Sequence, residues 1–240
     1  MLDSDLHWGA IMIRSRLANR EFEHSLSLLK QVFYAVERGV GNRAFRRAAP
    51  DVPEPRLLNL GCGPLIYQGW VNADDFAFKR WLFDRRFRPQ WRLDITRPWK
   101  CRSNHWDGIF TQHVLEHVTY SQATFVLEEC FRTLKPGAWL RISVPGIARY
   151  VDFYTGRETT PFFTRFPFRA LAISFFTQMH QHKSAWDGEL MTSLLRDIGF
   201  ESAKEVRVGE GTDPRLLKDK EAGQEQKAEE SLYVEARKPD

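Results

Sequence analysis

The spacing of hydrophobic residues changes at Arg56. Before that point, apolar side chains recur at alternating spacings of four and three residues, at Phe22, Leu26, Leu29, Phe33 and Val36. This spacing predicts an amphipathic helix, which we expect to end near Gly39. The segment RRAAPDVPEP follows, and its three prolines favour a linker. We therefore predict an N-terminal helical extension over residues 1–50 and a main domain over residues 51–240.

From Arg56 onward, short apolar segments alternate with longer amphipathic ones. The strand-like segments are RLLNL, GWVNAD, WRLDI, WDGIFTQ and AWLRISVP, followed near the end by SAKEVRV and SLYVEAR. Two segments are predicted helices: SQATFVLEECFRTL, which we expect KPG to end, and DGELMTSLLRDIGF, with Asp187 as its N-cap and Gly199 at its end. This alternation predicts an α/β fold with a mostly parallel sheet covered on both faces. A long connection without an obvious helix joins the last two strands, so we expect them to pair antiparallel.

Two regions do not fit this alternation. Residues 146–183 are irregular and rich in aromatic side chains, and we interpret them as an insertion on the substrate side of the domain. Residues 209–230 read GEGTDPRLLKDKEAGQEQKAEE and are highly charged. Such a composition favours a mobile loop.

Within the first of these regions, the segment PFFTRFPFRALAISFF combines six phenylalanines with Arg165 and Arg169. As a lid, its phenylalanines would shield the reaction site and its arginines would hold an anionic acceptor. As part of the core, the phenylalanines would pack on the sheet, and as an interfacial helix they would enter a lipid surface. We rank the lid first, the core second and the membrane third, since the segment is short and two prolines interrupt it.

Composition narrows the class of protein. The chain has 240 residues, 42% of them hydrophobic and 28% charged, which suits one globular domain with a sizeable core. No run of eighteen apolar residues and no signal-peptide pattern is present in the sequence. The three cysteines sit in unrelated contexts, which favours a reducing, cytoplasmic location over a disulfide framework or a zinc pattern.

Charge changes this picture little. The net charge of +4 is mildly basic, and arginines alternate with aromatic residues in KRWLFDRRFRPQWR and FFTRFPFRA. Such segments could meet phosphate, nucleic acid or a membrane surface. A solvated face is the better interpretation, because the sequence has no recognised nucleic-acid motif. We expect no nucleic-acid partner and do not favour peripheral membrane contact.

Glycines stand at the end of the first predicted strand, in LLNLGCGP. In a parallel α/β sheet, ligands bind beyond the carboxyl ends of the strands, and glycine lets a ligand approach the backbone closely. The third glycine of a dinucleotide fingerprint would fall at Ile66, which argues against a pyrophosphate site and a nicotinamide dehydrogenase. Gly61 and Gly63 therefore favour a smaller, nucleoside-type ligand.

Acidic residues follow the next two strands. Asp74 is the natural acceptor for ribose hydroxyls, whereas its neighbour Asp75 points to the opposite face of the strand. Asp94 and Ile95 could flank an adenine with one polar and one apolar side chain. Singly, Asp74 could be an ordinary turn residue and Asp94 a cap, but three strand ends equipped in this way favour the ligand site.

Six segments resemble, in the same order, the successive motifs of class I S-adenosylmethionine-dependent methyltransferases: LLNLGCGP, GWVNAD, LDIT, WDGIFTQHVLEHV, EECFRTLKPGAWLRISVP and LLRDIGF. They cover roughly residues 56–237. The segment HQHKSAWDGELMTSLLRDIGF further resembles a bacterial, type 11-like subgroup often associated with surface-polysaccharide synthesis. The resemblance implies a seven-stranded, Rossmann-like sheet and S-adenosylmethionine as cofactor. It places the donor at Leu60, Gly61, Cys62, Gly63, Asp74, Asp94, Ile95, Gln112 and His113.

One departure concerns the spacing between glycine and acid. Asp74 lies eleven positions after Gly63, whereas the dinucleotide spacing is about 20 residues. The first helix of the fold must be nearly absent, and this contraction also appears in the subgroup.

Three side chains with acid–base chemistry follow the fourth strand. His113, Glu116 and His117 lie at i, i+3 and i+4, so a helix would gather them on one face. They could form a base with an orienting carboxylate, a metal set or a structural hydrogen-bond group. A similar segment with two acids and a histidine binds a divalent cation in some ubiquinone-pathway O-methyltransferases. His113 stands here at the first acidic position, so we expect no metal.

A second candidate base lies in HQHK, before the helix at Asp187. A solvent-exposed polar loop would explain this segment equally simply, but the resemblance favours a function for His182. We therefore predict a methyltransferase that acts on oxygen of a sugar or glycan-pathway intermediate, with His113, His117 and His182 as candidate catalytic residues. The alternative is a methyltransferase fold that has lost turnover and serves as a binding or regulatory protein. The expected partner is a small-molecule or glycan acceptor.

Overall fold

The computed structural model describes residues 48–75, 89–157, 160–178, 181–220 and 225–240, which belong to one compact unit. The predicted helix over residues 22–36 lies outside them, so the N-terminal extension and its boundary at residue 50 stay predictions. Among the described residues, no helix has the length and apolarity needed to cross a membrane.

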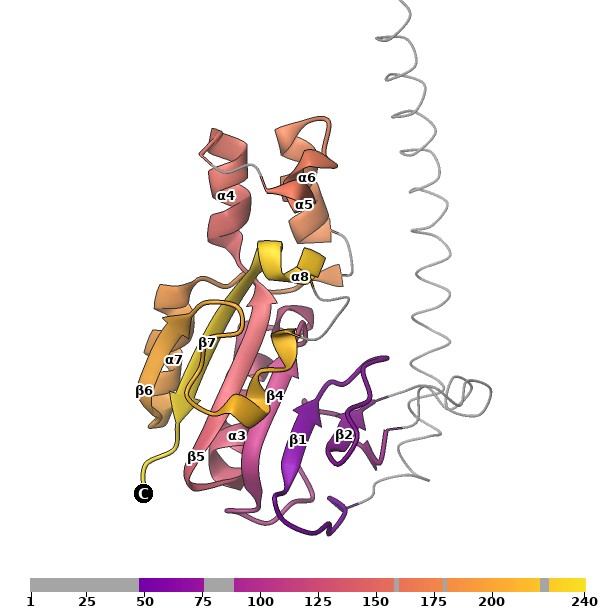
Figure 1. Cartoon of the computed structure of the whole chain (residues 1–240), viewed down its shortest axis with the longest axis vertical. Coiled ribbons are helices and arrows are strands. Elements are labelled where there is room, and N and C mark those ends of the chain that lie inside the picture. The colour runs from indigo at the N-terminus through magenta and orange to yellow at the C-terminus, as the bar shows by residue number, and fades with distance from the viewer. Residues whose placement is uncertain (1–47, 76–88, 158–159, 179–180, 221–224) are drawn as a thin grey trace, which may run out of the picture. The chain divides into compact units, whose positions relative to one another are not determined.

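Seven strands form one sheet in the order β3-β2-β1-β4-β5-β7-β6 (Figure 1). The strands β1 to β5 pair in parallel, whereas β7 is antiparallel to both of its neighbours, β5 and β6. The predicted α/β fold and the antiparallel final pair are therefore confirmed. The strand order reverses between β1 and β4, which is where ligands bind in folds of this kind. The strands are Leu57–Leu60, Val71–Asp74, Trp91–Arg92, Trp106–Gln112, Leu134–Pro145, Glu201–Val206 and Ser231–Arg237, numbered β1 to β7.

Local signals set the ends of the two longest helices. The helix α3 (Tyr120–Thr133) begins with a capping box between Thr119 and Gln122. The helix α7 (Gly188–Ile198) begins at the Asp187 side chain and ends at Gly199, which has a left-handed backbone, as predicted. The helix α3 ends at Thr133, just before the segment KPG as predicted, but this segment is already part of β5, which begins at Leu134 and whose register against β4 shifts there.

The remaining helical elements are shorter. Three of them follow β5, namely α4 (Ile147–Thr155), α5 (Pro161–Thr164) and α6 (Arg169–Gln178), and α8 (Glu225–Glu230) precedes β7. Short 3₁₀ turns are η1 (Leu115–His117), η3 (Pro214–Leu216) and η4 (Lys218–Lys220).

The main core lies between α3, α7 and one face of the sheet. Paired strand residues share a face, so Ile109, Leu140 and Ala236 all point to this side. The helices contribute residues such as Val126 and Leu195, all of them buried. This is the amphipathic pattern on which the helix predictions rest.

The opposite face of the sheet is unusually polar. Phe110, Arg141 and Glu235 lie side by side on it, and all three are buried. Residues 207–220 cover this face, and Leu216 from η3 packs against Leu57 and Phe110 in a second, smaller core. The prediction of a mobile loop is therefore wrong for the described residues of this region. Its Asp219 carboxylate pairs with Arg141 on the polar face of the sheet.

A buried ion pair fastens this segment. The Arg141 guanidinium donates to the Asp219 carboxylate from Nε at 3.0 Å and from Nη2 at 2.7 Å, and the two side chains are 2% and 0% exposed. Arg141 also donates to the Glu210 carbonyl at 2.7 Å, and the Gly209 backbone N–H donates to Asp219 at 2.6 Å. Burial of a charge is tolerated when its hydrogen-bonding groups are satisfied in this way.

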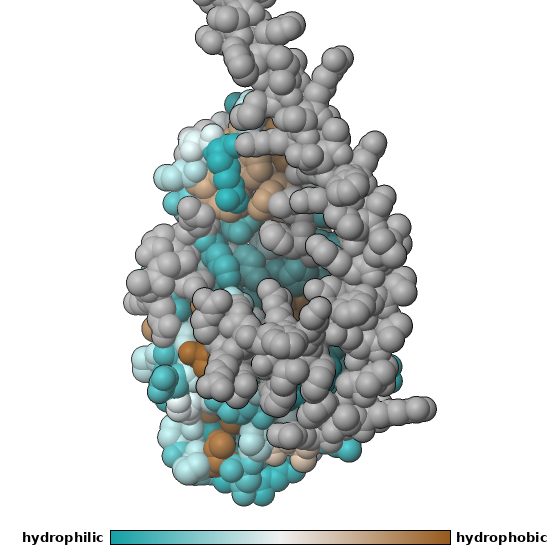
Figure 2. Space-filling view, turned by 90° about the vertical axis from the view of Figure 1, so that its right-hand side faces the viewer, coloured by the Kyte–Doolittle hydropathy of each residue, from teal (hydrophilic) through white to brown (hydrophobic). Residues whose placement is uncertain are grey.

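The helices α4, α5 and α6 form a separate aromatic cluster beyond the carboxyl end of β5 (Figure 1). Phe162, Phe163 and Phe176 are buried in it around Tyr150, rather than on the sheet. Arg165 lies over the ring of Phe162, 3.7 Å from its centroid. Three of the six phenylalanines are thus buried, but against one another and not on the sheet as the core interpretation expects, and Phe168 is exposed; the lid stays a prediction. Figure 2 shows brown, apolar side chains at this end of the described part, beside hydrophilic ones.

A second polar contact ties α3 to the segment that follows β3. The Glu129 carboxylate accepts the Trp99 backbone N–H at 2.9 Å and two N–H groups of Arg132, each at 2.7 Å. Burial acts to raise the pKa of Glu129, but the bonds from Arg132 and Trp99 outweigh it, so the pKa lies below its usual value. A lowered folded-state pKa stabilises the fold above the unfolded-state pKa, and this stabilisation is lost as the pH falls through the folded-state value.

Glu129→Gln should lower the free energy of unfolding by about 1–2 kcal/mol at neutral pH, because charge-assisted bonds are lost. The difference from the wild type should shrink as the pH falls below about 4, where the wild-type carboxylate also becomes protonated. Urea unfolding at both pH values measures it, with the exposed neighbour Glu128→Gln as control, expected to change stability by less than about 0.5 kcal/mol. An equal loss at neutral and strongly acidic pH would contradict the role of the charge.

Candidate active site

A glycine loop closes the end of β1. The backbone N–H groups of Gly61 and Cys62 both donate to the Ala73 carbonyl oxygen, at 2.8 and 3.0 Å, so the loop turns toward the end of β2. Gly61 and Gly63 have φ of +68° and +50°, which favours glycine at both positions. A Cβ atom on Gly61 would lie 2.3 Å from Val114, whereas one on Gly63 would meet nothing within 4 Å. Gly61 is thus required by packing, and Gly63 borders open space.

Asp74 meets this loop from the end of β2. One of its carboxylate oxygens, Oδ2, accepts the Gly63 backbone N–H at 2.8 Å. The neighbouring Asp75 lies 3.4 Å from Arg92, at the end of β3. The predicted acid therefore stands directly beside the predicted glycines despite the short spacing in the sequence.

Asp94 and Ile95, the residues after β3, make contacts within the protein. Asp94 accepts hydrogen bonds from the backbone N–H and the hydroxyl of Thr96, at 3.1 and 2.6 Å, and pairs with Arg97 at 3.1 Å. It therefore caps a turn, as the simpler interpretation expects. Ile95 packs partly against the main core. Contacts to an adenine stay a prediction for both residues.

At the end of β4, Gln112 and His113 behave differently. Gln112 is buried, and neither polar atom of its amide has a hydrogen-bond partner among the described residues. His113 has a φ of +53°, and its Nε2 lies 2.8 Å from the Ser231 hydroxyl at the start of β7. Its other ring nitrogen, Nδ1, lies 3.6 Å from Glu116.

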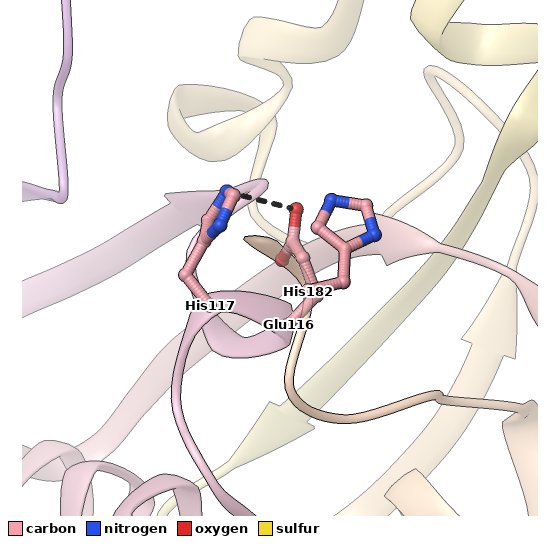
Figure 3. Close-up of side chains that lie close together, drawn as sticks. All are labelled: Glu116, His117 and His182. Atoms are coloured by element: carbon pink, nitrogen blue, oxygen red, sulfur yellow. Dashed lines mark ion pairs between the residues drawn. The ribbon is translucent and has the colours of Figure 1, made fainter. Parts of the chain in front are cut away.

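The predicted helix over His113–His117 is instead the single turn η1, and His113 lies outside it. Glu116 still lies between the two histidines, because its Oε1 is 3.8 Å from His117 Nε2. A third histidine, His182, joins them from the segment before α7 (Figure 3). The ligand atoms of Glu116, His117 and His182 all lie within 4.8 Å of one another. Glu116 is only 1% exposed, and neither of its oxygens has a hydrogen-bond partner among the described residues.

Backbone contacts hold the His182 segment against η1. The N–H groups of Lys183 and Ser184 both donate to the Glu116 carbonyl oxygen, at 2.7 and 3.3 Å. The Ser184 hydroxyl lies 3.0 Å from the Leu115 and Val118 carbonyl oxygens. These backbone hydrogen bonds therefore place His182 beside Glu116, so that the contact does not depend on side-chain conformation alone.

Further titratable groups surround Glu116. Burial raises the pKa of Glu116 to about 8, and the nearby Glu230 adds to this effect. Burial also raises the pKa of Glu230, which accepts a short hydrogen bond from the Tyr150 hydroxyl. Burial lowers the pKa of Lys227, which faces both carboxylates. Lys227 and Glu230 were not predicted as members of this site, because both lie in the stretch interpreted as a mobile loop.

The structure thus forms two adjacent groups from the predicted residues. The loop at Leu60–Gly63, Asp74 and Gln112 surround the ends of β1, β2 and β4, and His113 links them to the cluster of Glu116, His117 and His182. The individual roles of these residues stay predictions.

Comparisons with known proteins identify a family for the chain. A family model described as a methyltransferase domain matches residues 28–205. No curated protein matches the chain. Similar solved structures include human N-acetylserotonin methyltransferase in complex with S-adenosylmethionine (14% identity, TM-score 0.49, covering 78% of this chain and 48% of that one).

Two microbial structures are also similar. A methyltransferase from Thermotoga maritima has 15% identity and a TM-score of 0.49, covering 78% of this chain and 83% of that one. One from Archaeoglobus fulgidus has 14% identity and a TM-score of 0.46, covering 85% and 93%. The chain spans about half the length of the human enzyme and most of the other two. Since the family model covers most of the sequence and the sheet has the expected order, the chain belongs to the methyltransferase-domain family, as a class I S-adenosylmethionine-dependent methyltransferase.

Proposed function

We propose that this enzyme transfers the methyl group of S-adenosylmethionine to a hydroxyl oxygen of a sugar or glycan-biosynthesis intermediate. The observation that carries the proposal is the meeting of Glu116, His117 and His182 next to His113. The glycan acceptor is supported by the resemblance of HQHKSAWDGELMTSLLRDIGF to the polysaccharide-associated subgroup, since this segment supplies His182.

The residues at the ends of β1, β2 and β4 fit the donor. Open space beside Gly63 leaves room for a ligand close to the backbone. Asp74 offers a carboxylate for hydroxyl groups, and the buried amide of Gln112 has hydrogen-bonding groups that no described residue satisfies. These are polar groups of the kind that a nucleoside and an amino-acid moiety require.

The candidate bases in the site favour oxygen over nitrogen as the methylated atom, because a hydroxyl acceptor must lose its proton. The bound donor supplies an electrophilic methyl group on a positively charged sulfur, and S-adenosylhomocysteine leaves when the acceptor oxygen forms its bond to carbon. The acceptor hydroxyl must lose its proton, which requires a base in reach, whereas an uncharged amine can attack with its lone pair directly. His117 and His182 are bases of this kind, and Glu116 between them can orient the two imidazole rings.

The test is methyl transfer from isotopically labelled S-adenosylmethionine to purified sugar nucleotides and lipid-linked oligosaccharides. Mass spectrometry would locate the label, which we expect on oxygen. His117→Ala and His182→Ala should each lower kcat by about 100-fold or more, the usual contribution of acid–base catalysis, with S-adenosylhomocysteine affinity unchanged. Gln178→Ala, an exposed position of α6, is the control. Label on nitrogen or carbon, or full activity of both histidine variants, would contradict the proposal.

A further inference from the structure

We propose that Glu116, His117 and His182 bind a divalent transition-metal ion of the zinc type. The binding itself does not depend on the proposed function. Its consequence does: with the ion bound, the two histidines would be ligands instead of free bases, and the ion would hold the acceptor oxygen next to the methyl donor and ease the loss of its proton, a role that rests on the proposed function.

Geometry is the first support. Two imidazole nitrogens and one carboxylate oxygen converge within 4.8 Å, from two segments that backbone hydrogen bonds hold together. Figure 3 shows Glu116 between the two histidine rings, which stand nearly edge to face with 5.1 Å between their centroids. Metal–ligand distances of about 2.0–2.2 Å need ligand atoms about 3 Å apart, which small side-chain rotations would give.

The lack of hydrogen bonds to the Glu116 carboxylate is an independent second support. Its carboxylate is 1% exposed, and neither oxygen has a hydrogen-bond partner among the described residues. His113 and His117 lie 3.6 and 3.8 Å from Oε1, beyond hydrogen-bond length. A buried carboxylate without hydrogen bonds is costly and is normally paired with a cation.

The orientation of His182 is the third support. Its Nδ1 lies 2.6 Å from the Phe176 carbonyl oxygen, which can only accept, so this nitrogen carries the proton. In the neutral ring, Nε2 then has the lone pair that a metal ion requires. Histidine ligands in metal sites are fixed in this way by a hydrogen bond from their other nitrogen.

The donor atoms select the class of ion. Two histidines and one carboxylate suit Zn²⁺, Fe²⁺ or Co²⁺, whereas Mg²⁺ and Ca²⁺ prefer oxygen donors throughout. Our expectation of no metal considered His113 as the third ligand. In the structure, the ring of His113 contacts Ser231, and His182 occupies the place that the sequence pattern left open.

Metal titration of chelator-treated protein tests the proposal without any assay of activity. We expect about one Zn²⁺ per chain by calorimetry, no measurable Mg²⁺ binding, and a visible absorption spectrum with Co²⁺. Glu116→Gln and His182→Asn should each weaken Zn²⁺ binding by about 100-fold, the loss expected when one of three ligands is removed. His113→Asn, a histidine next to Glu116 but outside the proposed set, should weaken it by less than about tenfold.

Three results would overturn the proposal: no Zn²⁺ binding by folded wild-type protein, binding unchanged in His182→Asn, or an equal loss in His113→Asn. The first would leave Glu116 and its histidines as a proton-sharing cluster, and the last would return the metal to the set considered from the sequence. Circular dichroism confirms that each variant is folded. Since binding is measured directly, failure of the metal site would not be confused with failure to methylate a glycan.

Discussion

Asp219→Ala should lower the free energy of unfolding by about 3–5 kcal/mol, the cost of leaving one partner of a buried ion pair alone. The substitution removes both acceptors of the Arg141 guanidinium on that side chain and the acceptor of the Gly209 backbone N–H. Arg141 would then be a buried cation among the polar residues of the sheet face. Urea unfolding followed by circular dichroism measures the loss.

Two controls test whether the loss of stability comes from leaving a buried charge without its partner. Asp152→Ala removes an ion pair with Arg157 that is largely exposed, and it should cost less than about 1 kcal/mol. The double variant Arg141→Met with Asp219→Leu should regain the part of the loss that is due to the uncompensated charge, while the Gly209 N–H and the Glu210 carbonyl still lack their partners. A loss below about 1 kcal/mol in Asp219→Ala would show that the buried ion pair does not fasten residues 207–220 to the sheet.

This segment also shows where sequence analysis stops. Its composition is that of a solvated loop, and nothing local distinguishes Asp219 from the charged residues around it. The informative signal lay elsewhere, in the arginine within the apolar strand AWLRISVP. A charge on a buried strand requires a partner. Here the partner is Asp219, which lies 78 positions from Arg141 in the sequence, so the sequence pattern does not identify it.

Elements that are determined by residues close together in the sequence were predicted well. The helix α7 follows from its N-cap at Asp187, its final Gly199 and the apolar stripe between them, all within thirteen residues. The glycine loop and Asp74 could likewise be placed, because consecutive parallel strands bring their carboxyl ends to one edge of the sheet. Periodicity and capping depend on near neighbours, which a single sequence displays.

The acid–base cluster was only half predicted, for the opposite reason. His113, Glu116 and His117 are close in the sequence, and the pattern indicated them even though the expected helix is a single 3₁₀ turn. His182 was a candidate by resemblance, but no spacing rule connects it to Glu116. That contact arises from backbone bonds between Lys183 and Glu116, which only the folded chain reveals.

The donor site gives the second large expected effect. Asp74→Ala should weaken binding of S-adenosylmethionine by about 10- to 100-fold, or roughly 1.4–2.8 kcal/mol. Two contributions add up in this loss. The carboxylate can accept hydrogen bonds from ribose hydroxyls, and its Oδ2 orders the glycine loop through the 2.8 Å bond from Gly63.

Asp74→Asn and Asp75→Ala distinguish these contributions. The asparagine oxygen can still accept from Gly63, so Asp74→Asn should lose only the charge-assisted part and weaken binding by about tenfold. Asp75→Ala removes a carboxylate on the other side of the strand, paired with Arg92, and should leave affinity within about threefold of the wild type. Calorimetry with S-adenosylmethionine measures all three variants. Wild-type affinity in a folded Asp74→Ala protein would exclude Asp74 from the donor site, and equal losses in Asp74→Ala and Asp75→Ala would point to general loosening of the strand end.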